Sequence, residues 1–83
     1  MANRIYTVRD FYIRLKKLRL YSGYKKQREV ISIFDISRQV WSLWEMGKRL
    51  PSLVQVEFLA NFFKVDVGYF FTIDAEPEDY IVY

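Results

Sequence analysis

The sequence contains no cysteine and no histidine. Disulfides are therefore excluded, and so are the usual zinc sites and nearly all nucleophile–base pairs. General acid–base catalysis near neutral pH would then need a carboxylate or a lysine with a shifted pKa, and no pattern in the chain indicates one. We expect a protein that is not an enzyme and that has no metal and no cofactor.

Long apolar runs are also absent. No stretch approaches the roughly 18 apolar residues of a membrane span, and the N-terminus lacks the apolar core of a signal peptide. We therefore expect a cytoplasmic protein with no membrane partner. The 83 residues suit one small domain, and a composition that is 52% hydrophobic and 19% aromatic provides enough material for its core.

Acidic residues are scarce before residue 74. Residues 1–73 hold all 13 lysines and arginines but only six acids, a net charge of +7, whereas residues 74–83 hold four acids and no cation, a net charge of −4. A basic body with a short acidic tail is typical of a protein with a polyanionic partner. The charge pattern thus divides the chain into a basic body at residues 1–73, which would bind the polyanion, and an acidic C-terminal tail at residues 74–83.

Apolar residues recur at helical spacing along most of the chain. Gly23 and Gly47 end two of the predicted helices, and Ser52 with Gln55 forms a capping box at the start of another. The tail is either a frayed terminus or, because residues 80–83 are β-prone, a strand that pairs with residues 4–6 or with a second copy. The pattern predicts a compact all-α fold of five helices, at residues 8–21, 27–34, 37–46, 53–63 and 67–71.

The third of these helices has the side chains of a DNA-reading element. Ser37 is a good N-cap, and Arg38 and Gln39 place long polar side chains in the first turn. Arginine can contact both acceptors of guanine, and glutamine can pair with adenine. Trp41 and Trp44 could stack on single-stranded bases, but they fall on the apolar face, and we interpret them as core residues. The helix is therefore suited to a DNA major groove.

Residues 37–52 read Ser-Arg-Gln-Val-Trp-Ser-Leu-Trp-Glu-Met-Gly-Lys-Arg-Leu-Pro-Ser. This run resembles the recognition helix and following loop of the Cro/CI-type family, the lambda-repressor-like or Xre helix-turn-helix regulators of phages and bacteria. A weaker likeness extends from about residue 11 to residue 71. The resemblance implies a five-helix DNA-binding domain with its motif at about residues 27–46. Ile31, Asp35 in place of a turn glycine, and an extra residue within 23–27 depart from the family pattern, which predicts an altered angle between the motif helices.

The side chains and the resemblance together assign roles to individual residues. Contacts to base edges are expected from Arg38, Gln39, Ser42 and Leu43, the last through a thymine methyl group unless it is simply exposed. Contacts to DNA phosphates are expected from Lys25, Lys26, Gln27, Ser37, Lys48 and Arg49. The resemblance further implies a structural salt bridge between Arg19 and Glu45, and a dimer interface at Phe62, Val65, Val67 and Tyr69.

These expectations define one function and one alternative. The first is a sequence-specific double-stranded DNA-binding transcriptional regulator, a Cro-like or repressor-like homodimer of a phage or mobile element that binds a two-fold operator. The alternative is an antitoxin-like or antirepressor protein, which would use the helix-turn-helix scaffold as a protein-interaction module. In that case the acidic, β-prone tail would contact the protein partner.

Overall fold

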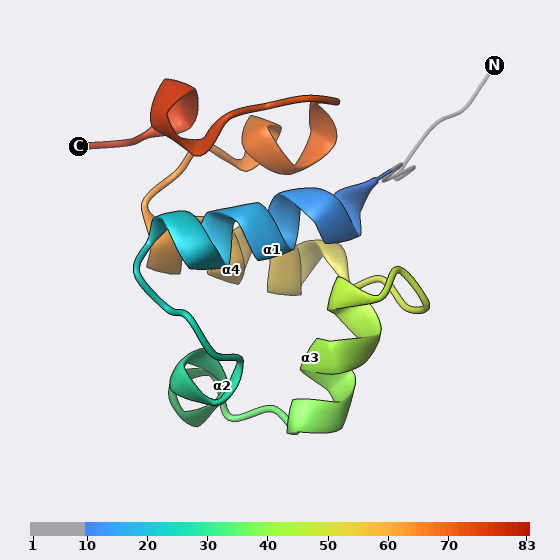
Figure 1. Ribbon diagram of the computed structural model, residues 1–83. Helices are drawn as coiled ribbons and strands as arrows, with labels where there is room; N and C mark the ends of the chain where they lie inside the picture. The colour runs from blue at the N-terminus through green and yellow to red at the C-terminus, as the bar shows by residue number, and fades with distance from the viewer. Residues whose placement is uncertain (1–9) are drawn as a thin grey trace, which may run out of the picture.

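The computed structural model describes residues 10–83, which fold into four α-helices followed by two short 3-10 helices (Figure 1). The all-α fold class is therefore confirmed. The count of five α-helices is wrong, because residues 67–71 form a 3-10 helix and a further 3-10 helix forms inside the predicted tail. The predicted helix start at residue 8 and the extended segment 4–6 lie outside the described residues. The elements are α1 (Phe11–Tyr21), α2 (Arg28–Phe34), α3 (Arg38–Glu45), α4 (Leu53–Phe63), η1 (Val67–Phe71) and η2 (Pro77–Tyr80).

Local side-chain chemistry sets the ends of α3 and α4. The Ser37 hydroxyl caps α3 by accepting a hydrogen bond from the backbone N–H of Val40 at 3.1 Å. The predicted capping box of α4 is confirmed, because Ser52 and Gln55 each accept from the other's backbone N–H, at 3.1 and 2.8 Å. Gly47 ends α3 as predicted, with a φ of +75° that favours glycine. These ends are decided within a few residues of sequence.

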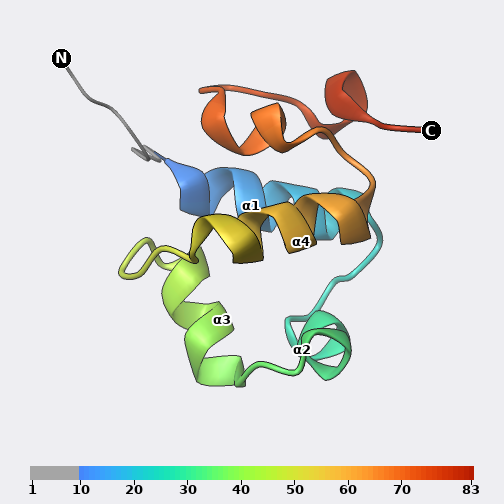
Figure 2. The same cartoon turned by 180° about the vertical axis from the view of Figure 1, so that it is seen from behind.

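The pair α1 and α4 forms the middle of the molecule. α1 lies in front of α4 in Figure 1 and behind it in Figure 2, so the two helices face opposite sides. In both views α2 and α3 extend to one side of this pair, and η1 and η2 lie on the other. Only residues 35–37 join α2 to α3, where Asp35 adopts a left-handed φ of +51°. A short polar side chain tolerates this conformation, so the turn forms without glycine.

The two tryptophans of α3 are core residues, as the sequence predicted. Trp41 and Trp44 are 0% and 2% exposed, and the Trp41 ring stacks on Phe34 with centroids 5.7 Å apart. Neither ring is available to stack on a nucleic-acid base. The other residues of the buried hydrophobic cluster are Phe11, Leu15, Leu18, Val30, Phe34, Val56, Leu59, Ala60, Val65, Tyr69, Phe70 and Ala75.

A buried polar contact fixes η1 against α1. The Tyr69 hydroxyl donates to the backbone carbonyl of Arg14 at 2.6 Å, and the Arg14 Nε donates to the carbonyl of Phe70 at 3.0 Å. Burial raises the pKa of Tyr69 above its ordinary value of 10.0, although the Arg14 charge opposes this shift. Burial likewise lowers the pKa of Arg14. Tyr69 is therefore held as a neutral donor inside the fold.

The acidic tail is part of the folded body. Its interpretation as a frayed terminus is wrong, because Ala75 and Pro77 are buried and Lys17 pairs with Glu76 at 3.1 Å. Within residues 10–83, the β-prone end forms one isolated antiparallel bridge, between Ile81 and Val65. Val65 is not one of the predicted partners, which were residues 4–6, outside the described residues, or a second copy. The tail thus covers the side of the molecule that carries η1.

Candidate nucleic-acid interface

One face of α3 is buried in the core, and the opposite face is exposed to solvent. Trp41, Trp44 and Glu45 are buried, whereas Arg38 and Gln39 in the first turn are exposed. This difference follows from the helical period, which turns residues 41, 44 and 45 toward α1 and residues 38 and 39 away from it. Arg38 and Gln39, two of the four residues predicted to contact base edges, therefore project into solvent from a helix that is anchored in the core.

The carboxylate of Glu45 accepts four hydrogen bonds inside the fold. Arg19 donates two of them, from Nε at 2.7 Å and from Nη2 at 3.1 Å, so the predicted salt bridge is present and bidentate. The Trp41 Nε1–H donates at 2.5 Å, and the Gln27 Nε2–H donates at 3.1 Å. Both side chains of the ion pair are almost completely buried, at 5% and 4% exposure. Glu45 thus ties α1, α3 and the start of α2 to one point.

Gln27 connects the start of α2 to α3. Besides donating to Glu45, its side-chain oxygen accepts the Ser42 hydroxyl proton at 2.8 Å. One N–H of the Gln27 amide is left for the predicted phosphate contact. Ser42 uses its proton within the protein, so the prediction that it contacts a base must be narrowed to accepting a hydrogen bond. Much of the hydrogen-bonding capacity of the Gln27 and Ser42 side chains is therefore used to fix the angle between α2 and α3.

Cationic side chains surround a hollow beside Gln27, where α1, the segment before α2 and the start of α3 meet. The hollow has a volume of about 380 Å³. Arg19 is neutralised by Glu45, but neither salt bridge within residues 10–83 involves the other cations of the hollow. Unpaired cations around one concavity create a positive potential that attracts polyanions. We call this site the basic hollow; it is lined by Arg19, Lys25, Lys26, Gln27, Arg28 and Arg38.

The basic hollow brings together Lys25, Lys26, Gln27 and Arg38, four of the residues predicted from the sequence. It adds Arg28, which those predictions missed. The signal was present in the sequence, because Arg28 continues the run Lys-Lys-Gln-Arg. Its position relative to α3, however, depends on the tertiary fold.

The other predicted phosphate contacts do not line the basic hollow. Lys48 and Arg49 are exposed in the loop between α3 and α4, beyond the far end of α3. Ser37 is exposed at the near end of α3, where its side-chain oxygen caps the helix. Within residues 10–83 its hydroxyl group donates no hydrogen bond. Leu43 is half-buried, so only part of its side chain could reach a base. Cations therefore lie beyond both ends of α3.

No protein-family model, curated protein or solved structure matches the chain.

The predicted dimer interface is partly wrong. Val65 and Tyr69 are 4% and 0% exposed, because Val65 is covered by the bridge to Ile81 and Tyr69 by its contact with α1. A second copy cannot reach either side chain. Phe62 is half-buried and packs against Phe34, with ring centroids 4.7 Å apart. Of the four candidates, Val67 is the most exposed, at 39%.

Proposed function

We propose that the protein is a sequence-specific double-stranded DNA-binding transcriptional regulator in which α2 and α3 act as a helix-turn-helix. The observation that carries this proposal is the basic hollow, where Arg38 of α3 lies with Arg28 at the start of α2 and with the two lysines of the preceding segment, Lys25 and Lys26. Phosphate binding needs cations without acidic partners, and base readout needs a long polar side chain beside them. Both requirements are met at the same end of α3.

The second group of cations supports the same docking mode. α3 has eight residues, which corresponds to a length of about 12 Å, and the major groove of B-DNA is also about 12 Å wide. With α3 in the groove, Lys25 and Lys26 would face one phosphate backbone while Lys48 and Arg49 face the other. Arg38 and Gln39 would then point to base edges between the two strands.

The hydrogen bonds of Glu45 provide the rigidity that base readout requires. A recognition side chain contributes specificity only when its helix holds it in register with the base edges. Arg19, Gln27 and Trp41 all donate to the Glu45 carboxylate, which restrains α3 against α1 and α2. We therefore assign Glu45 a positioning role in this function.

Regulation would follow from occlusion of a promoter by a homodimer on a two-fold operator. Selection of binding sites from a random duplex pool, with affinity measured across a salt series, tests this function. We expect an inverted repeat with half-sites about 34 Å apart, one turn of the duplex. Weak salt-sensitive binding without any recovered motif would refute sequence-specific recognition.

Variants of two cations separate base readout from phosphate binding. Arg38→Ala should weaken binding to the selected site by about 1–3 kcal/mol and relax the preference at one base position. Arg38→Lys should relax the same preference with an unchanged salt slope, because it keeps the charge but loses the bidentate fork. Lys48→Ala should weaken binding to all sequences alike and reduce the salt slope by about one. If Arg38→Lys keeps full site preference, α3 is not the reading helix.

The alternative is a protein-interaction module, either antitoxin-like or an antirepressor. Partly accessible Leu43 on α3 favours it, as do Val82 and Tyr83, which are 51% and 108% exposed at the end of the tail. This alternative predicts that neither Arg38→Ala nor Arg38→Lys affects function and that duplex DNA binds only weakly. The site selection therefore distinguishes the two functions.

A further inference from the structure

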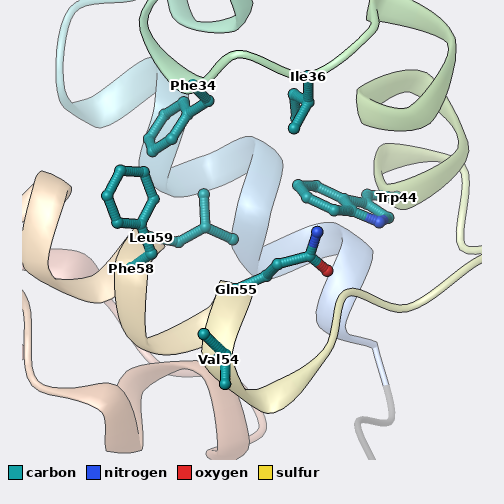
Figure 3. A pocket seen from close by; sticks show the side chains of 7 residues that line it. All are labelled: Phe34, Ile36, Trp44, Val54, Gln55, Phe58 and Leu59. Atoms are coloured by element: carbon teal, nitrogen blue, oxygen red, sulfur yellow. The ribbon is translucent and has the colours of Figure 1, made fainter.

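Ser42 lies on the face of α3 that carries Arg38. An α-helix turns by about 100° per residue, so Ser42, four positions after Arg38, lies one turn further along the same face. Trp44 faces nearly the opposite way and projects into an apolar pocket that Ile36 and Leu59 also line (Figure 3). Ser42 is half-buried, so part of the residue remains exposed on the side of Arg38.

The hydrogen bonds of Gln27 fix the orientation of its side-chain amide. Its Nε2 group donates to Glu45 at 3.1 Å, and that carboxylate, which is ion-paired with Arg19, can only accept hydrogen bonds. The amide oxygen therefore faces Ser42, at 2.8 Å from its Oγ. Turning the amide over would set its oxygen against the carboxylate, and two acceptors would then be in contact. The ion pair thus decides which end of the Gln27 amide Ser42 meets.

This orientation commits the hydroxyl proton of Ser42. A serine hydroxyl ordinarily rotates, so that it can donate or accept as its partner requires. The Gln27 oxygen can only accept, and the one Ser42 proton is therefore donated to it. Within residues 10–83 the Ser42 oxygen itself accepts no hydrogen bond. What Ser42 can offer to a bound molecule is therefore a lone pair, which requires a donor.

We propose that Ser42 selects an exocyclic amino group, so that the protein accepts adenine or cytosine and rejects guanine or thymine at one position of each half-site. In the major groove the amino groups of adenine and cytosine are donors, whereas guanine O6 and thymine O4 are acceptors. A guanine or thymine would place an acceptor against the Ser42 oxygen with no proton between them. The inference rests on the proposed function, because it requires α3 in the groove, and it makes Gln27 a positioning residue for Ser42.

Affinities for four duplexes test the role of Ser42. Each half-site position is varied through the four bases, and Ser42→Ala should relax the preference at one of them. At that position the parent chain should bind adenine and cytosine at least about fivefold more tightly than guanine and thymine, and Ser42→Ala should bind all four within about twofold. Ser32→Ala is the matched control, because Ser32 is an exposed serine of α2 whose hydroxyl bonds the carbonyl of Glu29. It should keep the preference of the parent chain.

Gln27→Ala tests the positioning role. Without the amide, the Ser42 hydroxyl can rotate and donate to guanine O6 or thymine O4, so the preference should fall below about twofold. Loss of a phosphate contact or of folded protein would instead weaken all four duplexes by the same factor, so the ratio between duplexes is the informative quantity.

A base analogue tests the amino group directly. Unsubstituted purine in place of adenine at the same position lacks only the amino group. This replacement should weaken binding of the parent chain about 3–10-fold more than binding of Ser42→Ala, the effect of one neutral hydrogen bond.

The outcomes separate this inference from the proposed function. The inference is overturned if the preference that Ser42→Ala relaxes is for guanine or thymine, if Ser42→Ala relaxes no position, or if Gln27→Ala leaves the preference intact. In each of these cases a recovered motif with an Arg38-dependent position would leave the proposed function standing. A chain that recovers no motif from the random pool would overturn both.

Discussion

Replacing Glu45 by alanine should be among the most damaging single changes in this protein. The substitution leaves the Arg19 guanidinium, whose side chain is 5% exposed, as a buried charge without its partner. Breaking a buried ion pair in this way typically costs about 3–5 kcal/mol. Gln27 and Trp41 also lose an acceptor. A chain of 83 residues has a total stability of only about 4–12 kcal/mol, so Glu45→Ala should remove about half of it.

Urea unfolding followed by far-UV circular dichroism measures this loss. Tryptophan fluorescence is a poor probe here, because Trp41 donates directly to the altered side chain. Glu57→Ala is the matched control: Glu57 is an exposed glutamate on α4, and its removal should change the free energy of unfolding by less than about 0.5 kcal/mol. The double variant Arg19→Met with Glu45→Met should be at least about 1 kcal/mol more stable than Glu45→Ala, because it leaves no buried charge unpaired. A loss below about 1 kcal/mol in Glu45→Ala, or no recovery in the double variant, would refute the reasoning.

Two further predictions concern the packing against α1. Because burial raises the pKa of Tyr69 above 10.0, the neutral phenol contributes stability that is fully present below pH 10 and is lost as the pH rises further. The free energy of unfolding, measured by urea titrations at several pH values from 9 to 11, should therefore fall less steeply with pH in Tyr69→Phe than in the parent chain. Equal slopes against pH would contradict this account. Gly47→Ala should cost about 2 kcal/mol or more in thermal unfolding, because φ is +75° and the added Cβ would lie 3.0 Å from Tyr12. Gly23→Ala is its control, since φ is +96° but a Cβ added there would meet no neighbouring atom within 4 Å. It should lower the free energy of unfolding by about 1 kcal/mol, and an equal loss at both positions would show that the contact with Tyr12 has no effect.

α3 both carries Arg38 of the basic hollow and belongs to the core through Trp41 and Trp44. Loss of the Glu45 hydrogen bonds would release α3 and so disturb the basic hollow and the core at once. For this reason stability should be measured alongside DNA affinity in any Glu45 variant, whereas variants of the exposed Arg38 report on the basic hollow alone.

The sequence by itself determined the helix ends and the inward faces. Ser37, Ser52 and Gly47 act on backbone groups within a few residues, so their effect can be predicted without the fold. The helical period likewise placed Trp41 and Trp44 in the core, because a face with two large aromatic rings must be buried somewhere. The salt bridge between Arg19 and Glu45 was implied by resemblance, since no local rule connects residues 26 positions apart.

Only the tertiary structure decided which surfaces stay open. Val65 and Tyr69 were predicted at a dimer interface but are buried, because Tyr69 reaches Arg14 across 55 positions and the tail returns to cover Val65. The basic hollow likewise combines residues from separate helices, namely Arg19 of α1, Arg28 of α2 and Arg38 of α3. Hydrophobic patterning predicts that a face will be buried but not which segment will cover it. The reason is that the hydrophobic effect is non-directional, so any apolar surface can cover the face. That choice requires the long-range contacts that the folded chain alone contains.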